Sequence, residues 1–142
     1  MRTDGRMEVQ EHVRRFNDRC AIRGDPQSAW QMVAGLIQQR GWKKPLFCKM
    51  TLLDDYVYDR AMSNHKLQPG THILMSVCAG MDLDLESTED VLSYIGVRLG
   101  ETKRGRAYKH IIRDMAGYSI HDRNEFLKML GLKPLGSNSK KK

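Results

Sequence analysis

The sequence predicts an all-α protein, on three observations. Apolar residues recur three and four positions apart in several segments, as they do along the buried face of a helix. No segment shows sustained alternation of apolar and polar residues, so we expect no sheet. Proline and glycine residues divide the chain where helices would start and stop. The 142 residues leave room for one compact domain plus its ends.

The first clear helix is expected over residues 26–40. Asp25 is suited to cap its start, and Pro26 to occupy the first position, where a missing N–H costs nothing. Gly41 supplies a stop. Its apolar stripe consists of Trp30, Val33, Leu36 and Ile37. A second possible amphipathic helix precedes it at residues 7–20, within a basic N-terminal arm.

Two short helices are expected next, over residues 45–50 and 54–63, joined by a tight turn at 51–53. The apolar face of the first is assigned to Leu46, Phe47 and Met50. Both starts are marked by suitable residues, namely Pro45 and then Asp54 or Asp55. A polar connection follows and ends at Pro69-Gly70.

Four more helical stripes complete the chain. The first ends near Gly80, the second begins at a cap on Asp84 and stops at Gly96, and the last stops at Gly131. Their apolar residues are, in order, Ile73, Leu74, Val77 and Cys78; Val91, Leu92 and Ile95; Tyr108, Ile111, Ile112 and Met115; and Phe126, Leu127 and Leu130. Residues 137–142 are expected to form a disordered basic tail.

Composition favours a binding protein with an anionic partner. The net charge is +7, and neutralising phosphates releases their counterions. Three cysteines without a CxxC pair argue against a disulfide framework and a zinc site: Cys20, Cys48 and Cys78. We see no apolar run of about 20 residues and no signal-peptide pattern, so we expect a cytoplasmic protein with no membrane contact.

The order of elements is typical of a helix-turn-helix, in which two short helices meet across a tight turn. Residues 28–96 resemble the lambda-repressor-like (Cro/CI or XRE-type) helix-turn-helix regulators. The resemblance rests on Pro45–Met50 as the first motif helix, 54–63 as the recognition helix, Gln68-Pro69-Gly70, and Met81–Glu86. Thr51 stands where the family has a turn glycine.

A second resemblance covers the C-terminal third, which is similar to a helical extension of some bacterial XRE-type regulators. Its motifs are Tyr94-Ile95-Gly96-Val97, Lys109–Arg113, Tyr118-Ser119-Ile120 and Asn124–Gly136. Together the resemblances imply a five-helix core at 26–96, preceded by an N-terminal helix or arm at 1–25. Two additional C-terminal helices at 97–136 and the tail at 137–142 follow.

The implied function is sequence-specific binding of double-stranded DNA by a transcriptional regulator or repressor, and the resemblance also implies a homodimer. The side chains aimed at base edges and nearby phosphates would be Tyr56, Tyr58, Arg60 and Asn64. Phosphate contacts would come from Lys43, Lys44, Lys49, His65 and Lys66. A basic loop at 98–106 contributes Arg104 and Arg106, for a phosphate backbone or an acidic partner. In the alternative interpretation, Tyr56 and Tyr58 are partly buried packing residues, and Arg60 and the basic loop are ordinary solvated charges.

Acidic residues in the recognition segment keep a second hypothesis open. Asp54, Asp55 and Asp59 would repel phosphates, which favours an adaptor that uses the same fold to bind a protein partner. An RNA-binding module is a weaker third hypothesis, because aromatic residues for base stacking are few. No HExxH, GxSxG, P-loop or GxGxxG pattern is present, so we expect no enzyme activity, cofactor or metal. Asp82-x-Asp84-x-Glu86 lacks the glycine of a calcium loop.

Overall fold

The structure is a computed structural model that describes Val9 and residues 26–136. Over these residues it is all-helical with no strand, which confirms the all-α prediction. The helices are α2 (Pro26–Arg40), α3 (Lys44–Thr51), α4 (Asp55–Ser63), α5 (Thr71–Gly80), α6 (Leu85–Ser93), α7 (Lys103–Arg113) and α8 (Ile120–Met129). The basic tail and the N-terminal arm, apart from Val9, lie outside the described residues.

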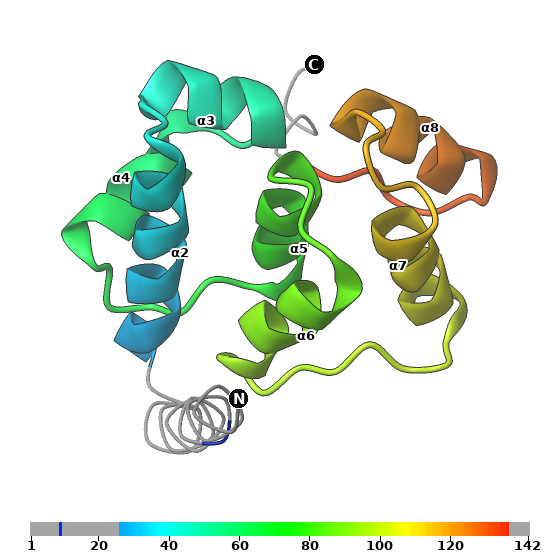
Figure 1. Ribbon diagram of the computed structural model, residues 1–142, viewed down its shortest axis with the longest axis horizontal. Helices are drawn as coiled ribbons and strands as arrows, with labels where there is room; N and C mark the ends of the chain where they lie inside the picture. Colours follow the sequence, from blue (N-terminus) through cyan, green and yellow to red (C-terminus); the bar gives the residue numbers. More distant parts are fainter. Residues whose placement is uncertain (1–8, 10–25, 137–142) are drawn as a thin grey trace, which may run out of the picture.

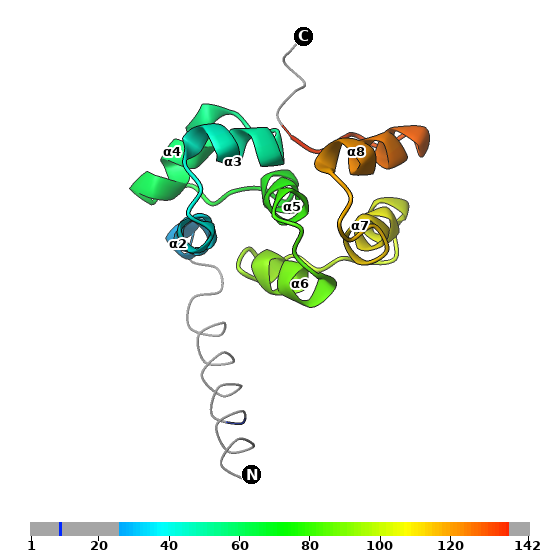
Figure 2. The same ribbon diagram turned by 45° about the horizontal axis from the view of Figure 1, so that its top comes forward.

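Helix α5 lies at the centre of the fold. Figures 1 and 2 show α2, α3 and α4 on one side of it and α7 and α8 on the other, with α6 below. The contacts agree, because α5 packs against α3, α6, α7 and α8, while α4 packs against α2 and α3. The two halves of the chain therefore share one packed core.

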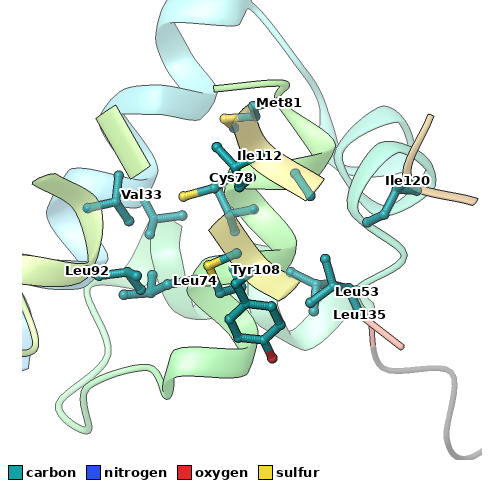
Figure 3. Close-up of a cluster of buried hydrophobic side chains, with 14 of the residues drawn as sticks. Val33, Leu53, Leu74, Cys78, Met81, Leu92, Tyr108, Ile112, Ile120 and Leu135 are labelled. Atoms are coloured by element: carbon teal, nitrogen blue, oxygen red, sulfur yellow. The ribbon is translucent and has the colours of Figure 1, made fainter. Parts of the chain in front are cut away.

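The central position of α5 follows from its composition. Every residue from Leu74 to Gly80 is buried, including Cys78, whose pKa is raised to about 12 by burial. Gly80 allows α3 to approach closely, since a Cβ there would lie 2.5 Å from the Met50 carbonyl oxygen. Figure 3 shows Cys78 within the apolar cluster, together with Val33 and Leu135.

Side-chain caps fix three of the helix starts. Asp84 accepts a hydrogen bond from the Ser87 amide at 2.8 Å, as its cap role predicts. Thr102 and Ser119 cap α7 and α8 in the same way. The cap at Thr102 begins α7 within the segment predicted as a basic loop, so residues 103–106 are helical.

One expected helix end also differs. The helix expected to run to Gly96 ends at Ser93, and the chain then turns through Gly96, which has φ 71°. Beyond this turn, Val97 donates its backbone N–H to the Leu92 carbonyl at 3.1 Å. The glycine therefore marks the end of the turn rather than the end of the helix.

A buried arginine joins the C-terminal helices to the centre. Arg123 on α8 is fully buried and donates to the Ala79 carbonyl at 3.1 Å and the Met115 carbonyl at 2.8 Å. It also donates to the Asp82 carboxylate at 2.5 Å, and Asp82 accepts the Gly117 amide at 3.0 Å. The ends of α5, α7 and α8 therefore meet at one guanidinium group.

The chain then returns to α5 through residues 131–136, which we call the C-terminal strap. Asn124 makes two hydrogen bonds to the backbone of Leu135, at 2.7 and 3.1 Å. Gly136 donates its amide to the Ser76 hydroxyl at 2.8 Å, and His72 Nε2 donates to the Gly136 carbonyl at 2.7 Å. These four hydrogen bonds hold Leu135 and Gly136, at the end of the strap, against α5 and α8.

Among the helices that the structure describes, none combines the length and apolar character needed to cross a bilayer.

Candidate nucleic-acid interface

The α3–turn–α4 unit is built by local hydrogen bonds. Thr51 donates its hydroxyl to the Phe47 carbonyl at 2.7 Å and accepts the Leu53 amide at 3.3 Å. Leu52 closes α3 by donating its amide to Cys48 at 2.8 Å, and it adopts the left-handed conformation with φ 62°. We expected Thr51 at the turn position, but Thr51 is the buried last residue of α3 and Leu52 makes the turn.

The inner face of this unit is narrow. Phe47 on α3 and Val57 and Ala61 on α4 are buried. Because Phe47 faces inward, Leu46 and Met50 beside it are 41% and 39% exposed. The sequence pattern had predicted one buried face made of Leu46, Phe47 and Met50. This prediction was wrong, because only Phe47 is buried.

The two tyrosines of α4 have different environments. Tyr58 is half-buried, and its ring lies 5.8 Å from that of Phe47 between centroids. Tyr56 is 44% exposed, and the Arg60 guanidinium lies over its ring at 4.6 Å. The outward side of α4 therefore presents Tyr56 and Arg60 as one stacked pair.

The acidic residues of α4 interact with α3. Lys44 Nζ lies 2.9 Å from Asp59 Oδ1, and this hydrogen bond raises the pKa of Lys44. The Cys48 thiol donates to Asp55 Oδ1 at 3.3 Å. Burial and this hydrogen bond raise the pKa of Cys48 to about 11, so the thiol stays protonated near neutral pH. Asp54 occupies the N-cap position of α4 without capping it through its side chain.

Three exposed lysines lie before, on and after the two helices of this unit. Lys43 immediately precedes α3, Lys49 lies on its outer face, and Lys66 lies in the loop after α4; all three are exposed. In this loop Trp30 donates its indole N–H to the Leu67 carbonyl at 2.5 Å, which ties the loop to α2. His65 is half-buried there, and Asn64 ends α4 in the left-handed conformation with φ 56°.

Arg104 and Arg106 lie elsewhere. Both are exposed on α7, and α5 stands between α7 and α4 (Figures 1 and 2). The structure therefore brings together the predicted residues of α3, α4 and the loop after α4, but it does not bring these two arginines to them.

Sequence reasoning missed the exposed apolar side chains of this surface. Leu46 and Met50 lie one helical turn apart on α3, and Met62 on α4 is 39% exposed. The spacing gave little signal, because Leu46 and Phe47 lie only about 100° apart around a helix, and a buried stripe can be that wide. Apolar protein partners suit such side chains.

Within the described ranges, no group of three or more His, Cys, Asp and Glu side chains is placed to hold a metal ion. Comparison with known proteins adds no relative, since no family model, curated protein or solved structure matches the chain.

Proposed function

We propose that the chain is a cytoplasmic, lambda-repressor-like helix-turn-helix regulator that binds double-stranded DNA in a sequence-specific manner, without enzymatic activity. In this proposal α4 enters the major groove, and Tyr56 and Arg60 read base edges. Lys43, Lys49 and Lys66 contact phosphates on either side. Most proteins of this type bind pseudo-palindromic sites, so the proposal includes a homodimer on DNA.

One observation carries the proposal. The carboxylates of Asp55 and Asp59, the main objection to groove entry, each have a partner on α3. The ammonium group of Lys44 offsets the charge of Asp59, and Asp55 accepts a hydrogen bond from the Cys48 thiol. The pairing of Asp59 with Lys44 therefore lowers the repulsion that α4 would exert on phosphates, while the charge of Asp55 remains.

The test is selection from randomised duplexes, followed by mobility shifts of the full chain at several salt concentrations. We expect an enriched motif and an affinity that falls steeply with salt. A triple variant, K43E/K49E/K66E, should reduce affinity at least a hundredfold and reduce the salt slope by about 3, at ~0.9 per lost phosphate contact. Stoichiometry by light scattering would show whether two chains occupy one site.

A matched control is R98E/R113E/K128E, which makes the same charge change on exposed residues of the opposite half. It should keep most of the affinity, because long-range charge effects are screened beyond about 10 Å in ordinary salt. An equal loss of DNA affinity in both variants would show that binding depends on the net charge of the protein and not on the lysines around α3 and α4. No selected motif, with binding insensitive to salt, would overturn the proposal.

The second candidate is an adaptor that binds a protein partner through the same surface. The exposed Leu46 and Met50 favour it, since apolar side chains on a short helix suit a protein contact. A variant with Leu46→Gln and Met50→Gln separates the two candidates. If this variant loses cellular function while its DNA affinity is unchanged, the adaptor is supported. In that case K43E/K49E/K66E should retain cellular function.

A further inference from the structure

A groove of about 350 Å³ lies between α7 and α8, away from α3 and α4. It is lined by Lys103, Arg106, Ala107, Phe126 and Leu130. Its volume is at the lower end of the range of ~300–1,000 Å³ that is typical of small-molecule sites. The groove combines an apolar wall with two cations, and the proposed function gives it no role.

The apolar wall is fixed without a ligand. Ala107 is buried, and Phe126 and Leu130 are half-buried. The imidazole ring of His110 stacks on Phe126, with centroids 4.6 Å apart and an interplanar angle of 19°. Because packing already orients the Phe126 ring, a ligand that binds here immobilises little of the wall.

The two cations are available to a ligand. Neither Lys103 nor Arg106 forms an ion pair with any carboxylate of the described residues. The acids closest in sequence to the lining residues pair with other lysines: Glu101 with Lys109 at 3.2 Å, and Glu125 with Lys128 at 3.1 Å. The groove therefore has a positive edge that the chain itself does not neutralise.

We infer that this groove binds a small carboxylate with an apolar aromatic or branched-alkyl body. The guanidinium of Arg106 suits a carboxylate because its planar N–H groups can pair with both oxygens, and Lys103 adds a second positive charge. The body lies on Phe126 and Leu130. A protein partner would need about 800 Å² of surface on this chain, far more than five side chains offer.

The experiment is an NMR titration of the ¹⁵N-labelled full chain with 4-phenylbutyrate, 4-phenylbutan-1-ol and acetate. We expect 4-phenylbutyrate to shift amides of α7 and α8 and to bind at least tenfold more tightly than either other probe. The alcohol lacks the negative charge of the carboxylate, and acetate lacks the apolar phenylalkyl group. Equal binding of 4-phenylbutyrate and the alcohol, or shifts confined to other helices, would overturn the inference.

Variants then assign the two parts of the groove. R106Q should weaken binding of 4-phenylbutyrate about tenfold and leave binding of the alcohol unchanged, whereas L130A should weaken both. K133Q removes an exposed lysine outside the groove and should change neither. Arg106 is exposed, so thermal unfolding of R106Q should match that of the wild type and exclude a folding defect. Unchanged carboxylate affinity in R106Q would overturn the assignment.

Discussion

Gly136 lies directly against Leu52, the residue that turns the chain from α3 into α4. A Cβ on Gly136 would lie 2.6 Å from the Leu52 Cβ and 2.8 Å from the Leu52 carbonyl oxygen. Gly136 also has φ 99°, a conformation that side chains disfavour. The end of the C-terminal strap thus packs against the centre of the candidate interface, 84 residues earlier in the chain.

Gly136→Ala is therefore expected to destabilise the fold by about 3 kcal/mol, from backbone strain plus the collision with Leu52. Gly131→Ala is the matched control, because Gly131 also has a positive φ but a Cβ there would meet nothing within 4 Å. It should cost about 1 kcal/mol, from strain alone. Urea unfolding measures both. Equal costs would show that the strap does not press on the turn.

The pair of Asp82 and Arg123 predicts how stability depends on pH. Burial disfavours the Asp82 carboxylate, but hydrogen bonds from the Gly117 amide and the Arg123 guanidinium outweigh it, so the pKa of Asp82 is lowered from 3.8. Because the pKa of Asp82 is lower in the folded state than in the unfolded chain, its ionised form stabilises the fold at pH values above the unfolded pKa. That stability is lost as pH falls through the folded pKa.

The variant Asp82→Asn tests this relationship. Asparagine tolerates the left-handed backbone at this position, φ 55°, so the variant alters mainly the charge. We expect it to lower stability at pH 7 by roughly 1–2 kcal/mol and to flatten the decline in stability below pH 4, measured by urea unfolding between pH 3 and 7. Asp122→Asn, which removes an exposed carboxylate, should retain the wild-type profile. An unchanged slope in Asp82→Asn would contradict the prediction.

Local signals predicted the helices well. Pro26 and Gly41 bound α2 where expected, and Asp84 caps α6 through its side chain. These signals act within a few residues, so a single sequence contains them. The start of α7 was missed because its basic residues suggested a loop, whereas the capping hydroxyl of Thr102 is a helix signal of the same local kind.

Long-range polar contacts were beyond prediction. Nothing in the local sequence around Arg123 indicates that this arginine is buried, because it bonds to Asp82, 41 residues away. Asn124 was assigned to a motif, but its bonds to Leu135 depend on where the strap crosses α8. At the candidate interface, the partners of Asp55 and Asp59 could not be predicted either, because they depend on how α3 crosses α4.

Cys48 is expected to react slowly with alkylating agents. Only a thiolate is nucleophilic, and a pKa of about 11 leaves roughly 0.1% thiolate at pH 8. The rate with iodoacetamide, followed by mass spectrometry of the Cys48 peptide, should rise about tenfold per pH unit up to pH 10. Asp55→Asn removes the negative charge that accepts the hydrogen bond of the thiol and raises the pKa of Cys48, so its rate should be several-fold higher.

Glu86→Gln, an exposed position on α6, controls for the loss of one negative charge and should leave that rate unchanged. A rate for the wild type that levels off below pH 9 would contradict the raised pKa. It would also argue against the hydrogen bond from the Cys48 thiol to Asp55.

The two tyrosines of α4 give a prediction that separates folding from recognition. Tyr58→Ala removes a half-buried ring that packs on Phe47, so we expect a loss of about 2 kcal/mol in unfolding free energy. Tyr56→Ala removes an exposed ring and should cost less than about 1 kcal/mol. Under the proposed function, Tyr56→Ala weakens binding to a selected duplex about tenfold, more than binding to random duplex. The opposite pattern, with Tyr56 needed for stability and Tyr58 for sequence preference, would mean that α4 presents a different face to the groove.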